Sequence, residues 1–107
     1  MVVGTIQMKV RSEKRREFLQ TMDDLMEELR ELHGCSSYRF YMSNGDPSEF
    51  QLISEWADFD VFQSHLTSHA FRVFRGSRPL LSDEPYAHVD LVSRRAQVDT
   101  VNDWNCA

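Results

Sequence analysis

The order of hydrophobic and polar residues predicts six elements along this chain. In a strand every second residue faces the same side, and in a helix apolar residues recur every three or four positions. The chain shows both patterns in the order strand, helix, strand, strand, helix, strand. The predicted segments are strands over 2–10, 35–43, 49–57 and 86–93, a helix from Ser12 to about Leu32, and a helix from Asp58 to about Arg78 that is interrupted at Thr67–Ser68.

Residues that favour helix ends and tight turns mark the boundaries of these segments. Ser12, Asp58 and Ser68 each precede a helical pattern, and their side-chain oxygens can cap the first free N–H groups. Gly34 follows the first helix and predicts a left-handed end. The stretch 43–48, with Asn-Gly and a proline, predicts the turn of a hairpin.

This order predicts an α+β fold of the ferredoxin-like type, an antiparallel sheet with both helices on one face. The other face is half apolar, so burying it against a second copy is favourable, and a two-fold homodimer is predicted. The residues assigned to that open face are Val3, Thr5, Gln7, Ile53 and Val89 or their neighbours. The folded domain is predicted to span 1–93. Residues 94–107 are either a frayed tail or a dimer arm that uses Val98, Val101 and Trp104.

Composition narrows the classes of function. The 107 residues suffice for one domain, and the net charge of −5 argues against a nucleic-acid partner, which needs a basic face. The two cysteines, Cys35 and Cys106, are too few for a disulfide framework. The first sixteen residues are expected to form neither a signal peptide nor a membrane span. A cytoplasmic protein without nucleic-acid or membrane partners is predicted.

The aromatic stretch 55–74 holds the residues with the most interesting chemistry. Trp56 is predicted to be core, the wall of a cavity where its indole N–H would face a ligand, or both at once. His65 is either a helix-terminal histidine bonded to backbone or a general base, since imidazole titrates near neutrality. His65 and His69 have the spacing of two metal ligands, but no third histidine or cysteine pair accompanies them, so no metal is predicted.

From Glu55 to Phe71 the pattern E-W-x5-F-x2-H-L-x-S-x2-F resembles the antibiotic biosynthesis monooxygenase (ABM) family. The strand ending in MKV and the Gly-Cys-x-x-Tyr opening of the second strand, at residues 34–38, are similar too, so the resemblance covers about residues 2–92. It implies a dimeric α+β barrel with a cavity between sheet and helices in each subunit. Members oxidise quinols or anthrone-like aromatics with O2 and no cofactor, degrade haem, or isomerise a sugar phosphate.

The resemblance transfers only some of the functional residues. The cavity tryptophan of the anthrone-oxidising members matches Trp56, but their asparagine falls on Leu52 and their tyrosine on Phe62. The histidine of the quinol-oxidising and signal-processing branches matches His65. The haem-degrading triad is missing, because its positions fall near Ile6, on His65 and on Arg75. Haem degradation is therefore not expected.

The leading hypothesis is a cofactor-independent monooxygenase that oxidises a hydroquinone or polycyclic phenol with O2. His65 and Trp56 are the predicted catalytic residues, and the predicted substrate-binding residues are Leu52, Phe62, His69, Phe74, Arg39 and Arg75. The alternatives are a non-catalytic binding module on the same fold, or an isomerase of a phosphorylated or keto substrate that uses Arg39 or Arg75. Arg39 also has an ordinary interpretation, an ion pair with Glu55 across the hairpin.

Overall fold

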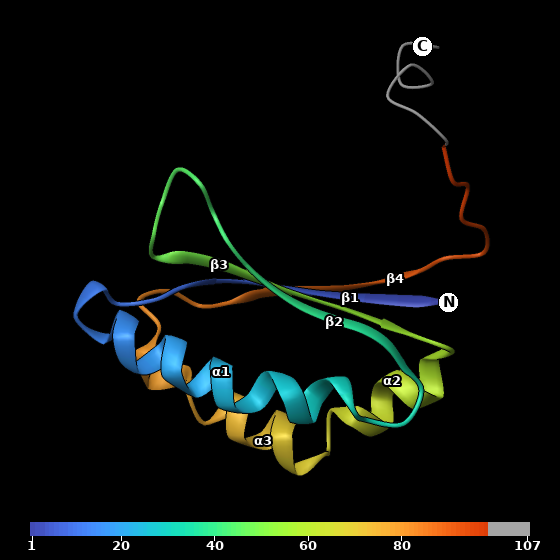
Figure 1. Cartoon of the computed structure of the whole chain (residues 1–107), viewed down its shortest axis with the longest axis horizontal. Coiled ribbons are helices and arrows are strands. Elements are labelled where there is room, and N and C mark those ends of the chain that lie inside the picture. Colours follow the sequence, from blue (N-terminus) through green and yellow to red (C-terminus); the bar gives the residue numbers. More distant parts are fainter. Residues whose placement is uncertain (99–107) are drawn as a thin grey trace.

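The structure is a computed structural model and describes residues 1–98. Its four strands form one antiparallel sheet in the order β2-β3-β1-β4 (Figure 1). The positions proposed for a dimer arm at Val101 and Trp104 lie outside the described residues. The elements are β1 (Val2–Lys9), η1 (Ser12–Lys14), α1 (Arg15–Arg30), β2 (Cys35–Met42), β3 (Glu49–Trp56), α2 (Phe59–His65), α3 (His69–Arg75), η2 (Arg78–Leu80) and β4 (Tyr86–Leu91).

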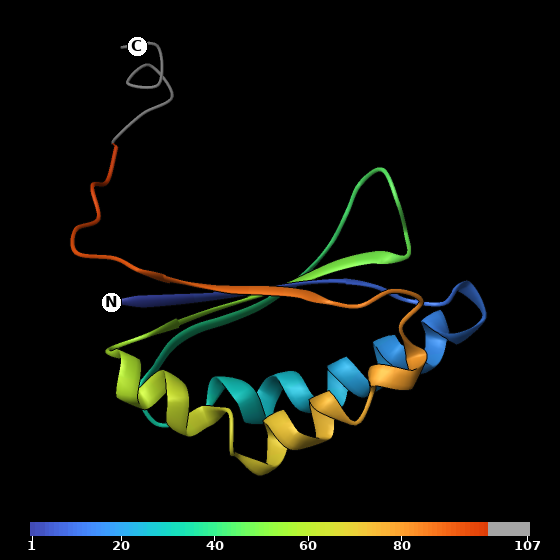
Figure 2. The ribbon, with the colours of Figure 1, turned by 180° about the vertical axis from the view of Figure 1, so that it is seen from behind.

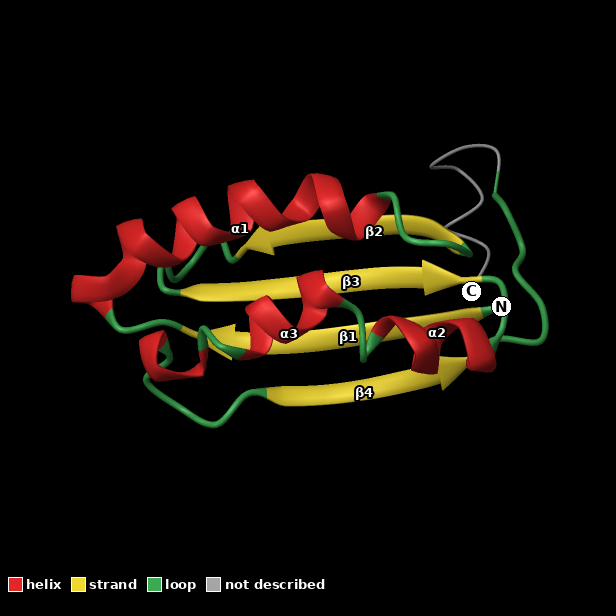
Figure 3. Ribbon diagram, turned by 90° about the horizontal axis from the view of Figure 1, so that it is seen from below, coloured by secondary structure: helices red, strands yellow, loops and turns green. Residues whose placement is uncertain are grey.

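All three α-helices lie on one face of the sheet, and no helix covers the other face among the described residues (Figures 1 and 2). Figure 3 shows α1 along the β2 side of the sheet, with α3 and α2 one after the other over its centre and β4 side. This arrangement confirms the predicted ferredoxin-like α+β fold. No helix within residues 1–98 is long and apolar enough to cross a membrane.

The core lies between β3 and α1, where the two amphipathic patterns meet. Phe18, Met22 and Leu29 of α1 are completely buried, as is Trp56 of β3, and Phe50 of β3 is nearly so. The rings of Phe18 and Phe50 pack with centroids 5.5 Å apart. Burial of each of these large side chains, from the apolar faces of α1 and β3, stabilises the fold by about 1.5–3 kcal/mol.

Two of the three predicted helix caps are confirmed. Asp58 Oδ1 accepts a hydrogen bond from the backbone N–H of Val61 at 2.9 Å, and Ser68 Oγ accepts one from Phe71 at 3.2 Å. These caps divide the aromatic segment into α2 and α3, as the interruption at Ser68 predicted. The Ser12 cap is wrong, because a 3-10 turn begins there and the Ser12 hydroxyl contacts the Glu13 carboxylate.

Gly34 connects α1 to β2 in the left-handed conformation that the sequence predicted, with φ of 80°. A Cβ atom at this position would overlap Cγ1 of Val61 in α2. The residue therefore meets two demands, since glycine accepts positive φ and also leaves room for α2 to approach the start of β2. The close approach fixes the helix that carries the candidate site.

Register assigns each strand residue to one face and corrects two predictions. On the open face Arg39, Ile53, Thr5 and His88 form one row across all four strands. Val89 is opposite Gly4 on the helix side, so its assignment to the open face is wrong. The ion pair of Glu55 is with Arg95 at 2.6 Å, not with Arg39, because Ser37 is the cross-strand neighbour of Glu55.

Candidate active site

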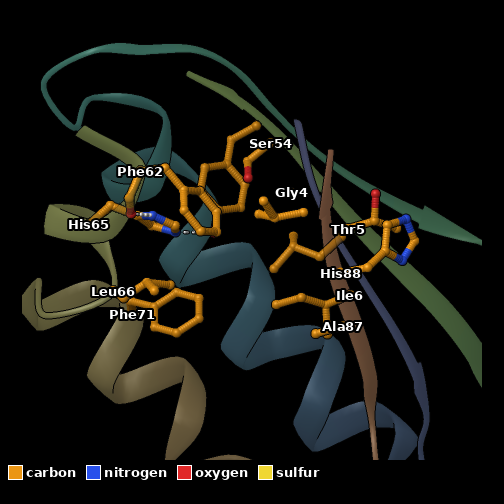
Figure 4. A pocket seen from close by; sticks show the side chains of 13 residues that line it. Gly4, Thr5, Ile6, Ser54, Phe62, His65, Leu66, Phe71, Ala87 and His88 are labelled. Atoms are coloured by element: carbon orange, nitrogen blue, oxygen red, sulfur yellow. Dashed lines mark hydrogen bonds between the residues drawn. The ribbon is translucent and has the colours of Figure 1, made fainter. Parts of the chain in front are cut away.

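A cavity of about 260 Å³ lies between the β1–β4 side of the sheet and the helices α2 and α3. The helices leave this side of the sheet incompletely covered, and Leu91 of β4 is 71% exposed. Small residues shape the space, because Ala87 occupies a helix-facing position where a larger side chain would fill it, and Gly4 leaves room for the Phe62 ring. Figure 4 shows His65, Leu66 and Phe71 on the helix side of this cavity, facing the strands.

Strand register forms the floor of the cavity. One row across the sheet consists of Tyr38, Ser54, Gly4 and Val89, and all four line the cavity. Thr5 and His88 also border it, but their side chains lie on the far side of the strands (Figure 4). The polar side chains that face inward from the described residues are therefore Tyr38, Ser54 and His65, and the rest of the wall is apolar.

Gly4 sets the position of the Phe62 ring. A Cβ atom on Gly4 would lie 2.8 Å from Cε1 of Phe62, closer than real Cβ contacts allow. The missing side chain lets the Phe62 ring approach β1. Phe62 was predicted as a substrate-binding residue, as was Leu52, and the structure places both on the cavity wall.

Two hydrogen bonds hold His65 at the end of α2, where it is only 4% exposed. Its Nδ1 lies 2.6 Å from the carbonyl oxygen of Phe62, and its Nε2 lies 3.1 Å from the hydroxyl of Tyr38 (Figure 4). A carbonyl oxygen only accepts, so Nδ1 carries the proton in the neutral ring. Nε2 is then the acceptor, and the Tyr38 hydroxyl donates to it.

Burial controls the ionisation of both partners. Burial lowers the pKa of His65, and its hydrogen bond to the Phe62 carbonyl offsets part of that effect. Burial raises the pKa of Tyr38 well above its usual value. The imidazole and the phenol are therefore both neutral in the resting protein. With its tautomer fixed, the neutral imidazole can act as a base through Nε2.

Trp56 supports His65 from behind instead of lining the cavity. The indole is completely buried and stacks on the imidazole with ring centroids 4.1 Å apart. Its Nε1 has no hydrogen-bond partner among the described residues. The structure thus brings the two predicted catalytic residues together, but it places the indole behind the imidazole and not against the cavity.

A second cavity of about 410 Å³ adjoins the first and shares Ile6, Phe71 and Ala87 with it. Phe74 and Arg75, both predicted to bind substrate, line this second space. The guanidinium of Arg75 lies 5.7 Å from the centroid of the Phe71 ring. The two spaces therefore lie next to each other between the sheet and the helices.

Two predicted substrate-binding residues lie elsewhere. His69 begins α3 and is exposed, and it does not border either of these two cavities. Arg39 is exposed on the open face of the sheet, in the row of Ile53. The structure does not bring either side chain to the cavity.

Three residues that the sequence reasoning did not select shape the cavity: Tyr38, Gly4 and Ala87. Tyr38 supplies the polar contact to His65, while Gly4 and Ala87 supply the space. Small residues at inward-facing positions of β1 and β4 could have predicted a cavity from the sequence. Nothing local in the sequence pairs Tyr38 with His65, which lie 27 residues apart.

Acidification is expected to destabilise the fold through His65. The folded chain holds this ring neutral with a lowered pKa, so the unfolded chain binds more protons once the pH falls below about 6.5. The free energy of unfolding therefore falls by at most about 1.4 kcal/mol per pH unit, which is the limit when the two states differ by one bound proton. Urea unfolding between neutral pH and pH about 5 should show a smaller loss for His65→Gln than for wild type. Equal losses would contradict this account, and His69→Gln, at an exposed position, is the matched control.

Comparison with known proteins places the chain in a family. The sequence profile described as "Antibiotic biosynthesis monooxygenase" matches residues 1–77. The chain belongs to this family. A relative from Bacillus subtilis (strain 168), described as "Putative monooxygenase YcnE", is 28% identical over 74 residues, which cover 69% of this chain and 78% of the relative.

Solved structures share the fold of this ABM chain. A crystal structure described as an antibiotic biosynthesis monooxygenase aligns with a TM-score of 0.81 at 20% identity, covering 88% of this chain and all of the other. Rv0793 from Mycobacterium tuberculosis aligns with a TM-score of 0.82 at 21% identity, covering 90% and 98%. At such identities these structures support the fold alone.

Proposed function

We propose that this ABM protein is a monooxygenase that oxidises a hydroquinone or a polycyclic phenol with O2, without metal or flavin. The observation that carries the proposal is His65, held neutral with a basic Nε2 at the wall of an otherwise apolar cavity. A planar apolar substrate suits such a wall, and a single base suits a substrate that reacts after losing one proton. Family membership supports the same chemistry.

The proposed reaction needs no external electron source because the substrate supplies the electrons. Removing the phenolic proton gives an electron-rich anion that can pass an electron to O2. A new C–O bond to the ring carbon then gives a peroxide anion, which takes back the proton. The ring carbon that carries the hydroperoxide also carries a hydrogen, and its C–H bond and the O–O bond break as water leaves. A quinone carbonyl remains, so one oxygen atom enters the product and the other leaves as water.

The apolar wall contributes by excluding water and by positioning the substrate. Leu66 and Phe71 face the strands across the cavity, so a flat ring system can lie between them and the floor, beside the Phe62 ring that packs on Gly4 (Figure 4). Holding the substrate beside the base replaces a bimolecular encounter by a positioned one. The second cavity, lined by Phe74 and Arg75, gives a larger substrate room to extend.

Oxygen uptake tests the proposal directly. Metal-stripped protein would be assayed with a panel of hydroquinones and anthrones against the autoxidation background. The expected result is uptake above background with at least one substrate, accompanied by a quinone product. Folded protein that gives no uptake with any substrate would contradict the proposal, and a non-catalytic binding module would then be the better interpretation.

A homodimer formed through the open face of the sheet is part of the proposal. Val3 and Ile53 give this face an apolar centre that is only partly exposed, and Tyr41 and Tyr86 on the same face are 48% and 61% exposed. A two-fold contact between copies would remove this apolar surface from water in both subunits at once.

Ile53→Arg is expected to convert the dimer into a monomer. The new guanidinium would lie beside Arg39 in the same sheet row and would lose its hydration in the interface. Val73→Arg is the matched control, because Val73 is 40% exposed on α3 in the helix layer. Sedimentation should give a dimer for wild type and Val73→Arg and a monomer for Ile53→Arg. A dimeric Ile53→Arg protein would place the interface elsewhere.

A further inference from the structure

His65 has no free acceptor for a substrate. Its Nδ1–H donates to the Phe62 carbonyl, and its Nε2 accepts from the Tyr38 hydroxyl. A phenolic substrate in the cavity therefore cannot reach the basic nitrogen unless Tyr38 moves away. Tyr38 is itself 2% exposed and is fixed in the sheet row that forms the cavity floor.

Resting on the proposed function, we propose that Tyr38 is a catalytic residue that accepts the substrate hydroxyl proton and relays its own proton to His65. The Tyr38 oxygen has two lone pairs when it donates to His65; a hydrogen bond from the Ser54 side chain uses one, and the other stays available to a substrate hydroxyl. Tyr38 lines the cavity, so a substrate hydroxyl that donates to that lone pair is connected through Tyr38 to the imidazole. Protons are thus transferred from the substrate to Tyr38 and from Tyr38 to His65.

The relay step is balanced without any other reactant. The substrate O–H bond breaks as a new O–H bond forms on Tyr38, and the former Tyr38 O–H bond breaks as Nε2–H forms on His65. The products are a substrate phenolate, a neutral Tyr38 and an imidazolium. The reverse movement returns the proton to the peroxide anion later in the reaction.

The surroundings of His65 support the charged ring that the relay creates. Nδ1–H already donates to the Phe62 carbonyl at 2.6 Å, and this hydrogen bond strengthens when the ring becomes positive. The face of Trp56 stacks on the ring at 4.1 Å and offers the negative side of its π system to a cation. Trp56 is thus a positioning residue that acts through His65.

A binding measurement without O2 tests the contact between Tyr38 and the substrate. Calorimetric titration under argon would compare 1-naphthol with its methyl ether, 1-methoxynaphthalene, which cannot donate. Wild type should bind the naphthol roughly threefold to tenfold more tightly than the ether, the value of one neutral hydrogen bond. Tyr38→Phe should lose this preference. A wild type with no preference, or a variant that keeps it, would overturn the proposal.

This test separates the relay from the proposed function. If the preference is present but no substrate gives oxygen uptake, the Tyr38 contact stands and the monooxygenase assignment fails. If uptake occurs without the preference, the relay fails and the assignment stands. Should Tyr38→Phe not fold, a wild type without the preference still overturns the relay.

Kinetics test the transfer itself. With an active substrate, Tyr38→Phe should lower kcat about 10²-fold, and the double variant Tyr38→Phe/His65→Gln should be no slower than the slower of the two single variants. When two residues act in one proton path, removing the second costs little further kcat. If Tyr38 only packed against its neighbours, the fold-losses in kcat of the two single variants would multiply in the double variant. Multiplying losses, or a Tyr38→Phe protein with wild-type kcat, would contradict the relay.

Discussion

Replacing His65 with glutamine is expected to lower kcat for oxygen uptake by about 10²–10⁴-fold, the usual contribution of a positioned general base. Glutamine can still accept a hydrogen bond from Tyr38 and donate one to the Phe62 carbonyl, but it cannot take a proton at neutral pH. The variant should therefore keep its fold while losing the chemistry. Polarographic assays with the best substrate of the panel would measure kcat for wild type and variant.

Two further variants sharpen this prediction. His69→Gln makes the same change at an exposed histidine at the start of α3 and should keep the wild-type rate. His65→Ala leaves the Tyr38 hydroxyl without its acceptor and opens a hole, so a loss of activity there mixes chemistry with packing. A folded His65→Gln protein with the wild-type rate would exclude His65 as the base.

The second large effect is on stability. Trp56→Ala is expected to lower the free energy of unfolding by about 3–5 kcal/mol, the usual cost of removing a buried large aromatic. The indole is completely buried against His65 and meets Tyr38 edge-on with centroids 5.9 Å apart. Such a loss is a large part of the roughly 5–15 kcal/mol that stabilises a domain. Urea unfolding at one fixed protein concentration would measure it.

Trp56→Phe is the matched control for this prediction. Phenylalanine keeps an aromatic ring and removes the indole N–H, which has no partner among the described residues. The loss should be clearly smaller than for alanine, because less volume is removed and a buried unsatisfied donor disappears. If both variants lose the same free energy, the indole N–H has a role in the folded protein that its surroundings do not show.

Much of the fold follows from local sequence signals, and most of the site does not. Alternation and helical spacing assigned the faces of β1, β3 and α1, and the caps at Asp58 and Ser68 divided the second helical segment correctly. Those features depend on residues within a few positions of one another. The Ser12 cap failed because a 3-10 turn precedes α1 and shifts the helix start to Arg15.

The site depends on register and on packing between layers, which single-sequence patterns do not specify. An irregularity between Cys35 and Ser37 sets which β2 residue pairs with each β3 residue. That register puts Tyr38 beside Ser54 under α2, and it puts Ser37 instead of Arg39 opposite Glu55. His65 could be selected from residue type, but its hydroxyl partner could only be found in three dimensions.

The proposed reaction transfers oxygen from O2 to a phenolic substrate in this cavity. The most direct measurement is mass spectrometry of the quinone formed by metal-stripped wild-type protein under isotopically heavy O2 in ordinary water. The quinone is expected to carry one heavy oxygen atom, and the other heavy atom is expected in water. A quinone without the label, formed together with hydrogen peroxide, would show that the chain removes electrons without transferring oxygen and would contradict the monooxygenase assignment.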